Sequence, residues 1–222
     1  MRIVALVPIR HYSARVKGKN YRSFNGKPLF FWIINTLAKS KLINEIIINT
    51  NSPVVKEGAP EISNKVKIID RPDQLCADTV PMNDIIHYDI CNVDADYYVQ
   101  THVTHPLLTI ETIEKAVNTF LQNDKYDSLF GVTKLQDRFW NLDGVAVNHD
   151  PQILLRTQDL PPIYKENSSI YIFSKESFSN NNNRIGNNPY MFEIGNIETY
   201  DIDTETDFII AEQLMKVSNR FS

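Results

Sequence analysis

A basic loop near the N-terminus carries the residues best suited to chemistry. It runs from Pro8 to Asn20, directly after an apolar run, Ile3–Val7, that predicts a buried first strand. The chain has a formal net charge of -4, yet four cationic side chains gather in this loop: Arg10, Arg15, Lys17 and Lys19. Guanidinium and ammonium groups neutralise phosphate oxygens, and ligands bind where the strands of an α/β sheet end. We therefore predict a polyphosphate site here, with a solvated basic loop as the alternative.

A second group of interest, Asp201-Ile202-Asp203, lies near the C-terminal end of the sequence. If Glu198–Asp203 is a strand, Asp201 and Asp203 are two positions apart and their carboxylates point to the same face. Paired carboxylates beside phosphates suit Mg²⁺, which bridges substrate phosphate oxygens. The alternative is that the aspartates cap the next helix, because the sequence that follows, Thr204–Asp207, also has the composition of a helix start. The spacing leaves both interpretations open.

The elements that must position these groups alternate between strand-like and helix-like segments, which predicts an α/β fold with a mainly parallel sheet. Strands are expected at Ile46–Ile48, Val66–Ile69, Asp96–Gln100, Ser128–Val132 and Ser169–Phe173, and helices at Pro28–Leu37, Met82–Cys91, Ile110–Leu121 and Asp207–Val217. The helix at Ile110–Leu121 has the clearest apolar stripe, with Thr109 as its cap. Between 133 and 163 the periodicity is lost, which predicts a protruding segment or a subunit contact.

Length and composition limit the class of protein. A chain of 222 residues, 42% of them hydrophobic, is expected to form one globular domain over residues 1–222. The pI of about 5.7 argues against nucleic acid as a partner, and no apolar run is long enough to cross a membrane. The first apolar run is too short for a secretory signal, and two cysteines make no disulfide framework. We expect a cytoplasmic protein.

Six segments in order make the chain resemble the acylneuraminate cytidylyltransferases, the CMP-sialic acid synthetase family. The first is the basic loop, followed by Asn25-Gly26-Lys27-Pro28-Leu29. The others are Arg71-Pro72 with Leu75 and Asp78-Thr79, Gln100 through Pro106-Leu107, Arg156-x-Gln158-Asp159-Leu160-Pro161, Asn167–Ile172 and Asp201–Thr204. The resemblance covers nearly the whole chain. It implies a Rossmann-like α/β sheet of the nucleotidyltransferase (nucleotide-diphospho-sugar transferase) type, with 133–163 as a protruding dimerisation segment.

The resemblance also implies Mg²⁺-dependent transfer of CMP from CTP to the anomeric hydroxyl of a 2-keto sugar acid of the sialic, legionaminic or pseudaminic acid type. Pyrophosphate would be released, and the product would serve surface polysaccharide biosynthesis in a homodimeric enzyme. The residues implied are Arg10, Ser13, Arg15, Lys19, Asn20, Lys27 and Asp78 for the nucleotide, Asp201 and Asp203 for the metal, and Gln100, Arg156 and Gln158 for the acceptor. Arg15, Lys19 and Asp203 would be catalytic, because nucleotidyl transfer depends on charge neutralisation.

Two features leave the acceptor and the activity open. The segment Thr101–His105 replaces the family's proline-threonine-serine run, which indicates a changed acceptor. His102 and His105 either bind that acceptor or are hydrogen-bonded loop residues. Because no residue pattern reads the base directly, a nucleotidyltransferase of the same fold with another base or acceptor is one alternative. A nucleotide-binding relative without catalysis is the other, and the joint presence of the basic and acidic groups favours the enzyme.

Overall fold

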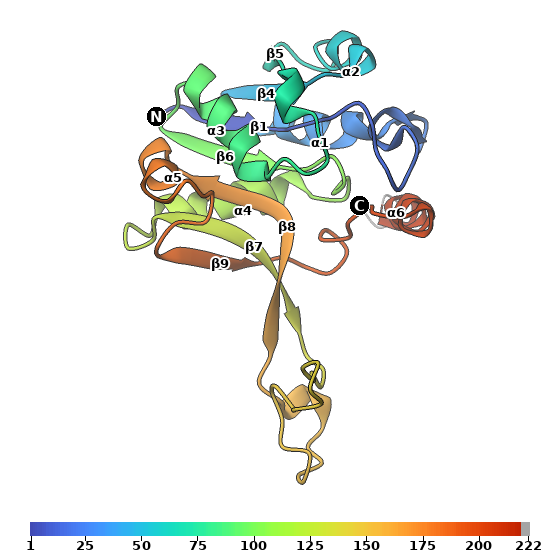
Figure 1. The fold of residues 1–222 in the computed structure, drawn as a ribbon, viewed down its shortest axis with the longest axis vertical. Helices are drawn as coiled ribbons and strands as arrows, with labels where there is room; N and C mark the ends of the chain where they lie inside the picture. Colours follow the sequence, from blue (N-terminus) through green and yellow to red (C-terminus); the bar gives the residue numbers. More distant parts are fainter. Residues whose placement is uncertain (219–222) are drawn as a thin grey trace.

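A seven-stranded sheet with the strand order β5-β4-β1-β6-β8-β7-β9 forms the centre of the computed structural model, which describes residues 1–218 (Figure 1). The strands are β1 (Ile3–Leu6), β4 (Glu45–Thr50), β5 (Val66–Asp70), β6 (Tyr97–Thr101), β7 (Ser128–Leu135), β8 (Ile163–Phe173) and β9 (Pro189–Glu193). A separate two-stranded hairpin joins β2 (Ser23–Phe24) to β3 (Lys27–Pro28).

The sheet is mainly parallel, as the alternating pattern predicts. β1 pairs in parallel with β4 and β6, β4 with β5, and β7 with β9. β8 pairs antiparallel with both of its neighbours, β6 and β7, so it runs against the other strands of this sheet. The sequence pattern does not predict β9, because this strand is short, begins with proline and lies at the sheet edge.

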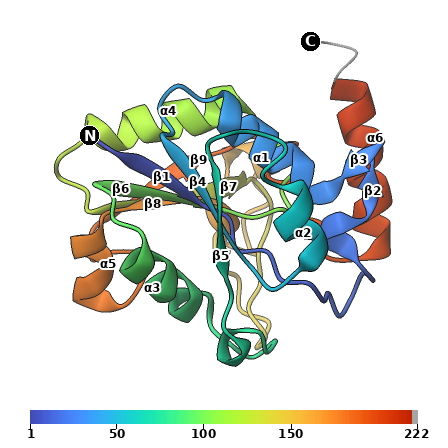
Figure 2. The ribbon, with the colours of Figure 1, turned by 90° about the horizontal axis from the view of Figure 1, so that it is seen from above.

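Helices cover both faces of the sheet, and β1 contributes to both cores. Ile3 and Ala5 pack with α1 (Leu29–Lys39), α4 (Ile110–Leu121) and α6 (Glu205–Ser218), whereas Val4 and Leu6 pack with α3 (Met82–Asn92) and α5 (Lys175–Asn181). Figure 2 shows α1 and α4 on one side of the sheet and α3 and α5 on the other. Burying an aliphatic side chain stabilises the fold by ~1.5–3 kcal/mol, so the strand that precedes the basic loop is firmly held.

The helix ends follow local signals. α4 has the predicted bounds, and the Thr109 side chain accepts a hydrogen bond from the Thr112 N–H. α1 begins at Leu29 rather than Pro28, because Pro28 pairs with Ser23 in the β2–β3 hairpin. The remaining helix, α2, covers Pro53–Gly58, and short 3-10 turns occur at Lys19–Tyr21, Asp73–Leu75 and Thr157–Asp159. None of the helices in the described part of the chain has the length and apolar content of a membrane span.

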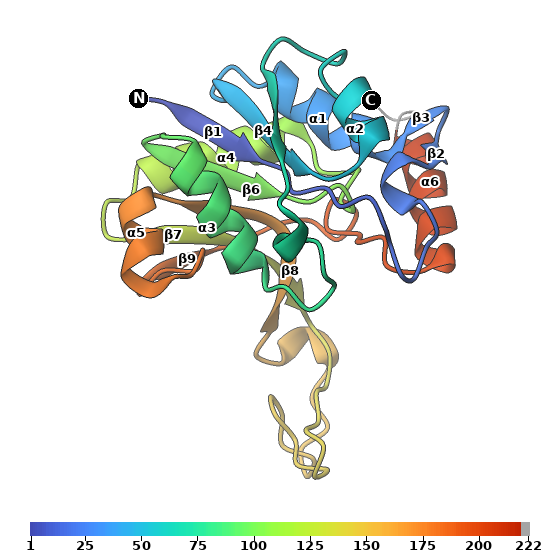
Figure 3. The same cartoon turned by 45° about the horizontal axis from the view of Figure 1, so that its top comes forward.

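Strands β7 and β8 continue past the body of the molecule into a long arm (Figures 1 and 3). We define the arm tip as residues 136–162, which connect the two strands. The predicted segment 133–163 contains this tip, although Thr133–Leu135 still pairs with β8. Large apolar side chains on the tip face solvent, including Leu142, which is 103% exposed, and Leu154, which is 90% exposed. An apolar surface of this kind is typical of a contact with another chain.

Candidate active site

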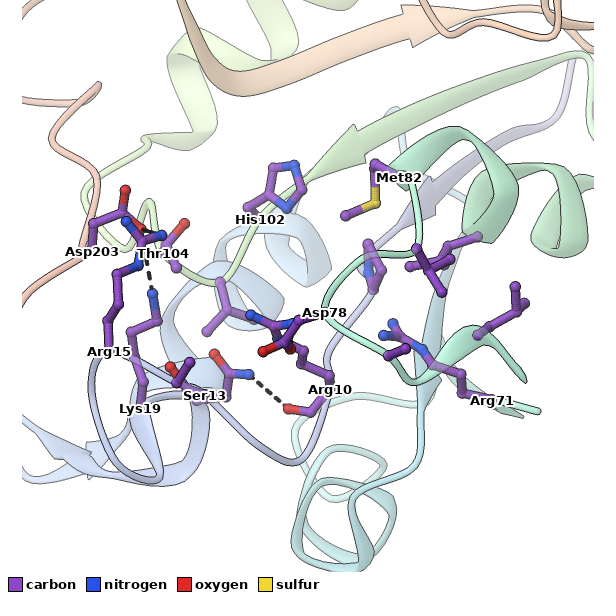
Figure 4. Close-up of a pocket in the computed structure, with 18 residues that line it drawn as sticks. Arg10, Ser13, Arg15, Lys19, Arg71, Asp78, Met82, His102, Thr104 and Asp203 are labelled. Atoms are coloured by element: carbon purple, nitrogen blue, oxygen red, sulfur yellow. Dashed lines mark hydrogen bonds and ion pairs between the residues drawn. The ribbon is translucent and has the colours of Figure 1, made fainter. Parts of the chain in front are cut away.

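A cavity of about 400 Å³ lies at the carboxyl ends of the parallel strands (Figure 4). Its walls come from the loop after β1, the segment after β5 and the segment after β6. The strand order runs outward from β1 through β4 to β5, and β6 then lies on the other side of β1. The switch point between β1 and β6 is where open α/β sheets bind their ligands. This cavity is therefore the candidate active site.

The basic loop after β1 forms one wall of the cavity. Gly18 has a φ of 65°, and a Cβ built there would lie 2.9 Å from the Tyr21 ring, so glycine is required at this turn. The turn leads into the 3-10 segment Lys19–Tyr21. Asn20 donates from Nδ2 to the Arg10 carbonyl oxygen at 2.8 Å, which ties the loop together. Five residues predicted to bind the nucleotide line the cavity from this loop: Arg10, Ser13, Arg15, Lys19 and Asn20.

Asp201 and Asp203 lie in a loop between β9 and α6, so the prediction of a strand at Glu198–Asp203 is wrong. Residues 195–200 form successive turns instead, and the following backbone makes a single hydrogen bond to the segment after β6, from the Ile202 N–H to the Thr104 carbonyl at 3.0 Å. One such bond anchors a loop but makes no strand ladder. Ile202 is nevertheless buried, as the alternation predicts, and the flanking aspartates are partly exposed.

Thr204 and Asp207 cap the start of helix α6. Thr204 Oγ1 accepts a hydrogen bond from the Asp207 N–H at 3.2 Å, and Asp207 Oδ2 accepts from the Thr204 N–H at 2.7 Å. This reciprocal arrangement satisfies two of the free N–H groups at the helix start. The carboxylate of Asp203 therefore has no capping role. Of the two interpretations of this segment, the one in which the aspartates cap the helix is excluded for Asp203.

Asp203 contacts the basic loop directly. Its Oδ1 lies 2.6 Å from Arg15 Nη2 and 3.8 Å from Lys19 Nζ (Figure 4). Lys19 also donates to the carbonyl oxygen of Ile202. Burial lowers the pKa of Lys19, and the negative charges of Asp203 and Asp201 oppose that shift. The fold thus brings together cations and a carboxylate that lie more than 180 positions apart in the sequence, since Arg15 and Asp203 are separated by 188.

Asp201, the other predicted metal ligand, does not line this cavity; together with Asp203 it lines a neighbouring one. Its Oδ1 is buried and has no hydrogen-bond partner among residues 1–218, and His105 Nδ1 lies 4.0 Å away. A buried oxygen without a partner beside a phosphate site fits Mg²⁺, which takes one or two carboxylates and completes its shell with phosphate oxygens and water. The described residues contain no cluster of three or more His, Cys, Asp or Glu side chains suited to a metal. Asp201 and Asp203 would therefore hold Mg²⁺ jointly with a phosphate ligand.

Asp78 lies at the cavity mouth, where it forms an ion pair with Arg10. The side chains are 63% and 38% exposed, respectively. Ion pairs this exposed contribute about 0–1 kcal/mol, so a phosphate can readily replace Asp78 as the partner of Arg10. The predicted nucleotide residue Asp78 is thus placed at the cavity, as a counter-ion to the loop.

A buried network beneath the cavity floor involves two residues that the sequence pattern did not single out. Arg71, which lines the cavity, donates from Nε to Asn49 Oδ1 at 2.7 Å and from Nη2 to the Asn49 carbonyl at 3.0 Å. Asn49 in turn donates to Asp89 Oδ1 at 2.5 Å. Burial raises the pKa of Asp89 to about 7, although the hydrogen bond from Asn49 and the charge of Arg71 oppose this shift. The network fixes one face of the Arg71 guanidinium.

Gln100, which the family resemblance assigns to the acceptor, is fully buried. Its amide makes hydrogen bonds within the protein, so it does not line the cavity. The residues of this segment that line the cavity are His102, Val103 and Thr104. The part of this segment that reaches the cavity therefore begins at His102, two residues after the Gln100 that the resemblance indicates.

Three other predicted residues lie away from the cavity. Lys27 is on β3, with its Nζ over the Phe31 ring at 5.5 Å. Arg156 and Gln158 belong to the arm tip, where Arg156 is 72% exposed and pairs with Asp159 at 2.7 Å. Within one chain, these residues do not join the nucleotide loop and Asp203.

A switch-point cavity with a cationic loop on one wall and two carboxylates beside it is the arrangement of an enzyme that acts on nucleotide phosphates. Comparison with known families gives the particular class. The cytidylyltransferase family model matches residues 4–220, and the chain belongs to this family. The protein is accordingly a nucleotidyltransferase, which confirms the family resemblance of the sequence motifs.

Named relatives extend over most of the chain. It is 29% identical to the CMP-N,N'-diacetyllegionaminic acid synthase of Legionella pneumophila, over 98% of each protein. It is 26% identical to the N-acylneuraminate cytidylyltransferase of Streptococcus agalactiae, over 94% of this chain and 52% of that protein. A solved structure of CMP:2-keto-3-deoxy-manno-octonic acid synthetase complexed with CTP superposes with a TM-score of 0.74 at 17% identity, over 98% of this chain and 100% of that one. This structural likeness shows that the fold is shared.

Proposed function

We propose that this protein transfers CMP from CTP to the anomeric hydroxyl of a 2-keto sugar acid of the sialic, legionaminic or pseudaminic acid type, with Mg²⁺ as cofactor and pyrophosphate as the second product. The product would feed surface glycan biosynthesis. The observation that carries the proposal is the convergence of Arg15 and Lys19 on Asp203 at the switch-point cavity. The relatives named above, which are sugar-acid cytidylyltransferases, support the choice of base and acceptor class.

In this reaction an oxygen–phosphorus bond forms between the anomeric oxygen and the α-phosphorus, and the bond from the α-phosphorus to the β-phosphate oxygen breaks. The hydroxyl proton leaves to solvent. Arg10, Ser13 and Lys19 hold the triphosphate along the loop wall, and Arg15 offsets charge that develops on the leaving pyrophosphate. Bound by Asp201 and Asp203, Mg²⁺ would neutralise phosphate charge and lower the pKa of the attacking hydroxyl.

The salt bridges of the free protein support this assignment of the loop. Arg15 is 65% exposed and Arg10 is 38% exposed, and each is paired with an aspartate that is itself at least 41% exposed. Because such pairs contribute little, the two arginines can exchange their carboxylate partners for phosphate oxygens without a large free-energy cost. The loop is thus set in position before the nucleotide arrives.

The arm supports a homodimer. Its exposed apolar residues need a protein surface to cover them, and a second copy is the partner that every such molecule meets. In a dimer, the arm tip of one copy would bring Arg156 and Gln158 to the cavity of the other, where the guanidinium would bind the acceptor carboxylate. This accounts for the distance between these two residues and the cavity of their own chain.

The proposal is tested by following the α-phosphate. CTP labelled with ³²P at the α position is incubated with Mg²⁺ and N,N'-diacetyllegionaminic acid, N-acetylneuraminic acid or a pseudaminic acid. The label is expected to move into a CMP-sugar whose mass equals the acceptor plus CMP minus water. Label that stays in CTP with every acid, while CTP still binds, would favour the alternative of a catalytically silent relative. Transfer from UTP or GTP instead would make it a nucleotidyltransferase for another base.

A further inference from the structure

His102 reaches the candidate cavity from the end of β6. Figure 4 shows its ring between Thr104 and Met82. The imidazole is partly buried, and among residues 1–218 its Nε2 has one hydrogen-bond partner, Gln100, whereas Nδ1 has none. The direction in which this ring can donate a hydrogen bond therefore depends on which nitrogen carries the proton.

Arg184 determines which His102 nitrogen carries the proton, because it fixes the orientation of the Gln100 amide. Its Nη1 lies 2.6 Å from Gln100 Oε1, and a guanidinium can only donate, so the atom that faces it must be the amide oxygen. The amide nitrogen of Gln100 then donates to the Thr101 carbonyl at 3.1 Å and faces His102 Nε2 at 2.9 Å. All the hydrogen-bonding groups of this amide are in use, and a flipped amide would place its NH₂ against the arginine.

The His102 ring is consequently an acceptor at Nε2. A neutral imidazole that accepts at Nε2 carries its proton on Nδ1. An imidazolium would direct a second N–H at the Gln100 NH₂ group, which the hydrogen-bond pattern disfavours. Burial lowers the pKa of His102 well below its usual value, and the nearby charges of Arg184, His105 and Lys19 lower it further. The ring thus presents a fixed Nδ1–H donor and no positive charge.

Arg184 is itself firmly held, although it lies on a loop between α5 and β9. Its guanidinium stacks 3.6 Å from the centroid of the Tyr171 ring, and its Nη2 lies 4.0 Å from Glu166 Oε1. Tyr171 also donates its hydroxyl proton to Glu166. The Arg184 side chain is 15% exposed, so this charge is largely enclosed and paired. A cation anchored in this way can keep the Gln100 amide in one orientation.

We propose that His102 binds the acceptor by donating its Nδ1–H to an oxygen of the sugar acid, and that Gln100 and Arg184 are positioning residues that fix this tautomer. The proposal rests on the proposed function. The partner would be an oxygen that can accept, such as a carboxylate, carbonyl or hydroxyl oxygen, because a group that can only donate, such as an ammonium, would find no partner at Nδ1–H. In the proposed function Arg10, Arg15 and Lys19 hold the nucleotide phosphates on the loop wall, and we assign the facing β6 wall to the acceptor.

The tautomer is measured first, on the ligand-free protein, by two-bond ¹H–¹⁵N correlation NMR of histidine-labelled enzyme, with His102→Asn as the assignment reference. The expected spectrum has His102 as the Nδ1–H tautomer from pH 6 to 8. In Gln100→Glu the new carboxylate can only accept, so His102 should gain a proton on Nε2, as the other tautomer or as imidazolium. An Nε2–H tautomer in the unaltered protein would overturn the proposal, whatever reaction the enzyme catalyses.

Kinetics then locate the partner of Nδ1–H. His102→Asn keeps an amide donor near the position of Nδ1, whereas His102→Leu removes it. His102→Leu is expected to raise the KM for N,N'-diacetyllegionaminic or N-acetylneuraminic acid about 10- to 100-fold, the range for a lost hydrogen bond to a charged group, and His102→Asn should restore most of that loss. The KM for CTP should stay unchanged in both. A raised KM for CTP with an unchanged KM for the acid would overturn the proposal by assigning His102 to the nucleotide.

Variants of Arg184 test whether it acts on His102 through Gln100 or only contributes to packing. Arg184→Lys keeps the charge but loses the planar fork, and Arg184→Met keeps the bulk, so both should raise the acceptor KM and change the His102 NMR signature together. His87→Asn, at an exposed histidine on α3, should change neither. If no acid supports transfer of CMP while the Nδ1–H tautomer is found, the proposed function fails and the acceptor assignment fails with it. An Nε2–H tautomer in an enzyme that does transfer CMP overturns the role proposed for His102, Gln100 and Arg184 and leaves the proposed function in place.

Discussion

The two walls of the cavity are built in opposite ways. The loop wall carries Arg10 and Arg15 in partly exposed ion pairs with Asp78 and Asp203. The β6 wall carries His102, whose pKa is lowered by burial, backed by a buried amide and an enclosed arginine. Cations in weak, exposed ion pairs can exchange their carboxylate partners for phosphate oxygens. A hydrogen-bond donor held in one position would select an oxygen by its position. In the proposed function, one wall would supply the charge that neutralises phosphate and the other would supply the selectivity for the acceptor.

The largest expected effect is on the loop side, from Asp203→Asn. The change removes the carboxylate that contacts Arg15 and Lys19 and, with Asp201, would hold Mg²⁺. We expect turnover to be lost while the fold, measured by circular dichroism and thermal unfolding, is retained. Glu205→Gln is the matched control, because Glu205 pairs with Arg22 outside the cavity. Normal turnover of Asp203→Asn with Mg²⁺ present would remove the metal and catalytic roles.

Arg15→Ala should give the next largest effect. Loss of one preorganised charge donor costs about 2–4 kcal/mol of transition-state stabilisation, which corresponds to a fall of roughly 30- to 1,000-fold in kcat/KM. Lys17→Ala serves as the control, because Lys17 is an exposed cation of the same loop that does not line the cavity. Equal losses for Arg15→Ala and Lys17→Ala would mean that the loop acts only through its general positive charge.

The arm bears on the β6 side of the cavity, because in the proposed dimer it would bring acceptor-binding residues there from a second copy. Leu142→Asp combined with Leu154→Asp places charge on the most exposed apolar part of the tip. Sedimentation velocity should then show a shift from dimer to monomer, with loss of acceptor turnover and unchanged CTP binding. Ile209→Asp, on the exposed face of α6, is the control and should leave the assembly unaltered. An unaltered protein that sediments as a monomer at assay concentrations would contradict the homodimer.

The smallest effect on turnover, but a clear one on stability, should come from Asp89→Asn. The folded state keeps the proton of Asp89 up to about pH 7, whereas an unfolded chain releases it near pH 4. The folded state thus binds more protons in this window, so its stability should fall as pH rises from about 4 to 7, by up to ~4 kcal/mol. Asparagine cannot ionise and can still accept the hydrogen bond from Asn49.

Denaturant unfolding at several pH values tests this prediction. Asp89→Asn should flatten the stability profile between pH 4 and 7 and make the protein relatively more stable above pH 7. Asp84→Asn, at a carboxylate in the first turn of the same helix, is the control and should leave the slope in place. Identical slopes for Asp89→Asn and the unaltered protein would mean that Asp89 is ionised in the folded state despite its burial.

The loop wall could be predicted from the sequence, because its groups are contiguous. Arg10, Ser13, Arg15 and Lys19 fall within ten positions after an apolar strand, so their place at the mouth of the sheet could be predicted from their order, and the structure has all four on the cavity wall. The parallel sheet and α4 were predictable for a related reason. Their apolar periodicities are local, as the agreement of the α4 bounds illustrates.

The β6 wall could not be predicted in the same way, because tertiary contacts decide which of its residues face the cavity. Gln100 and Arg184 are 84 positions apart, and nothing in the sequence near either residue indicates that one fixes the amide of the other. The register of β6 decides that Gln100 is buried and that His102 lines the cavity. The aspartate pair shows a third case: Asp203 contacts the basic loop, Asp201 does not line the same cavity, and turns rather than a strand hold both residues.

The proposed reaction is tested as a whole by pyrophosphate release from CTP, UTP, GTP and ATP with Mg²⁺, each against a panel of 2-keto sugar acids and a control without acceptor. The account predicts release from CTP alone, and only when a sugar acid is present. Release that is independent of the acid, or equal for all four nucleotides, would contradict it, because neither result is compatible with an enzyme whose loop wall binds the CTP phosphates and whose β6 wall selects the acid.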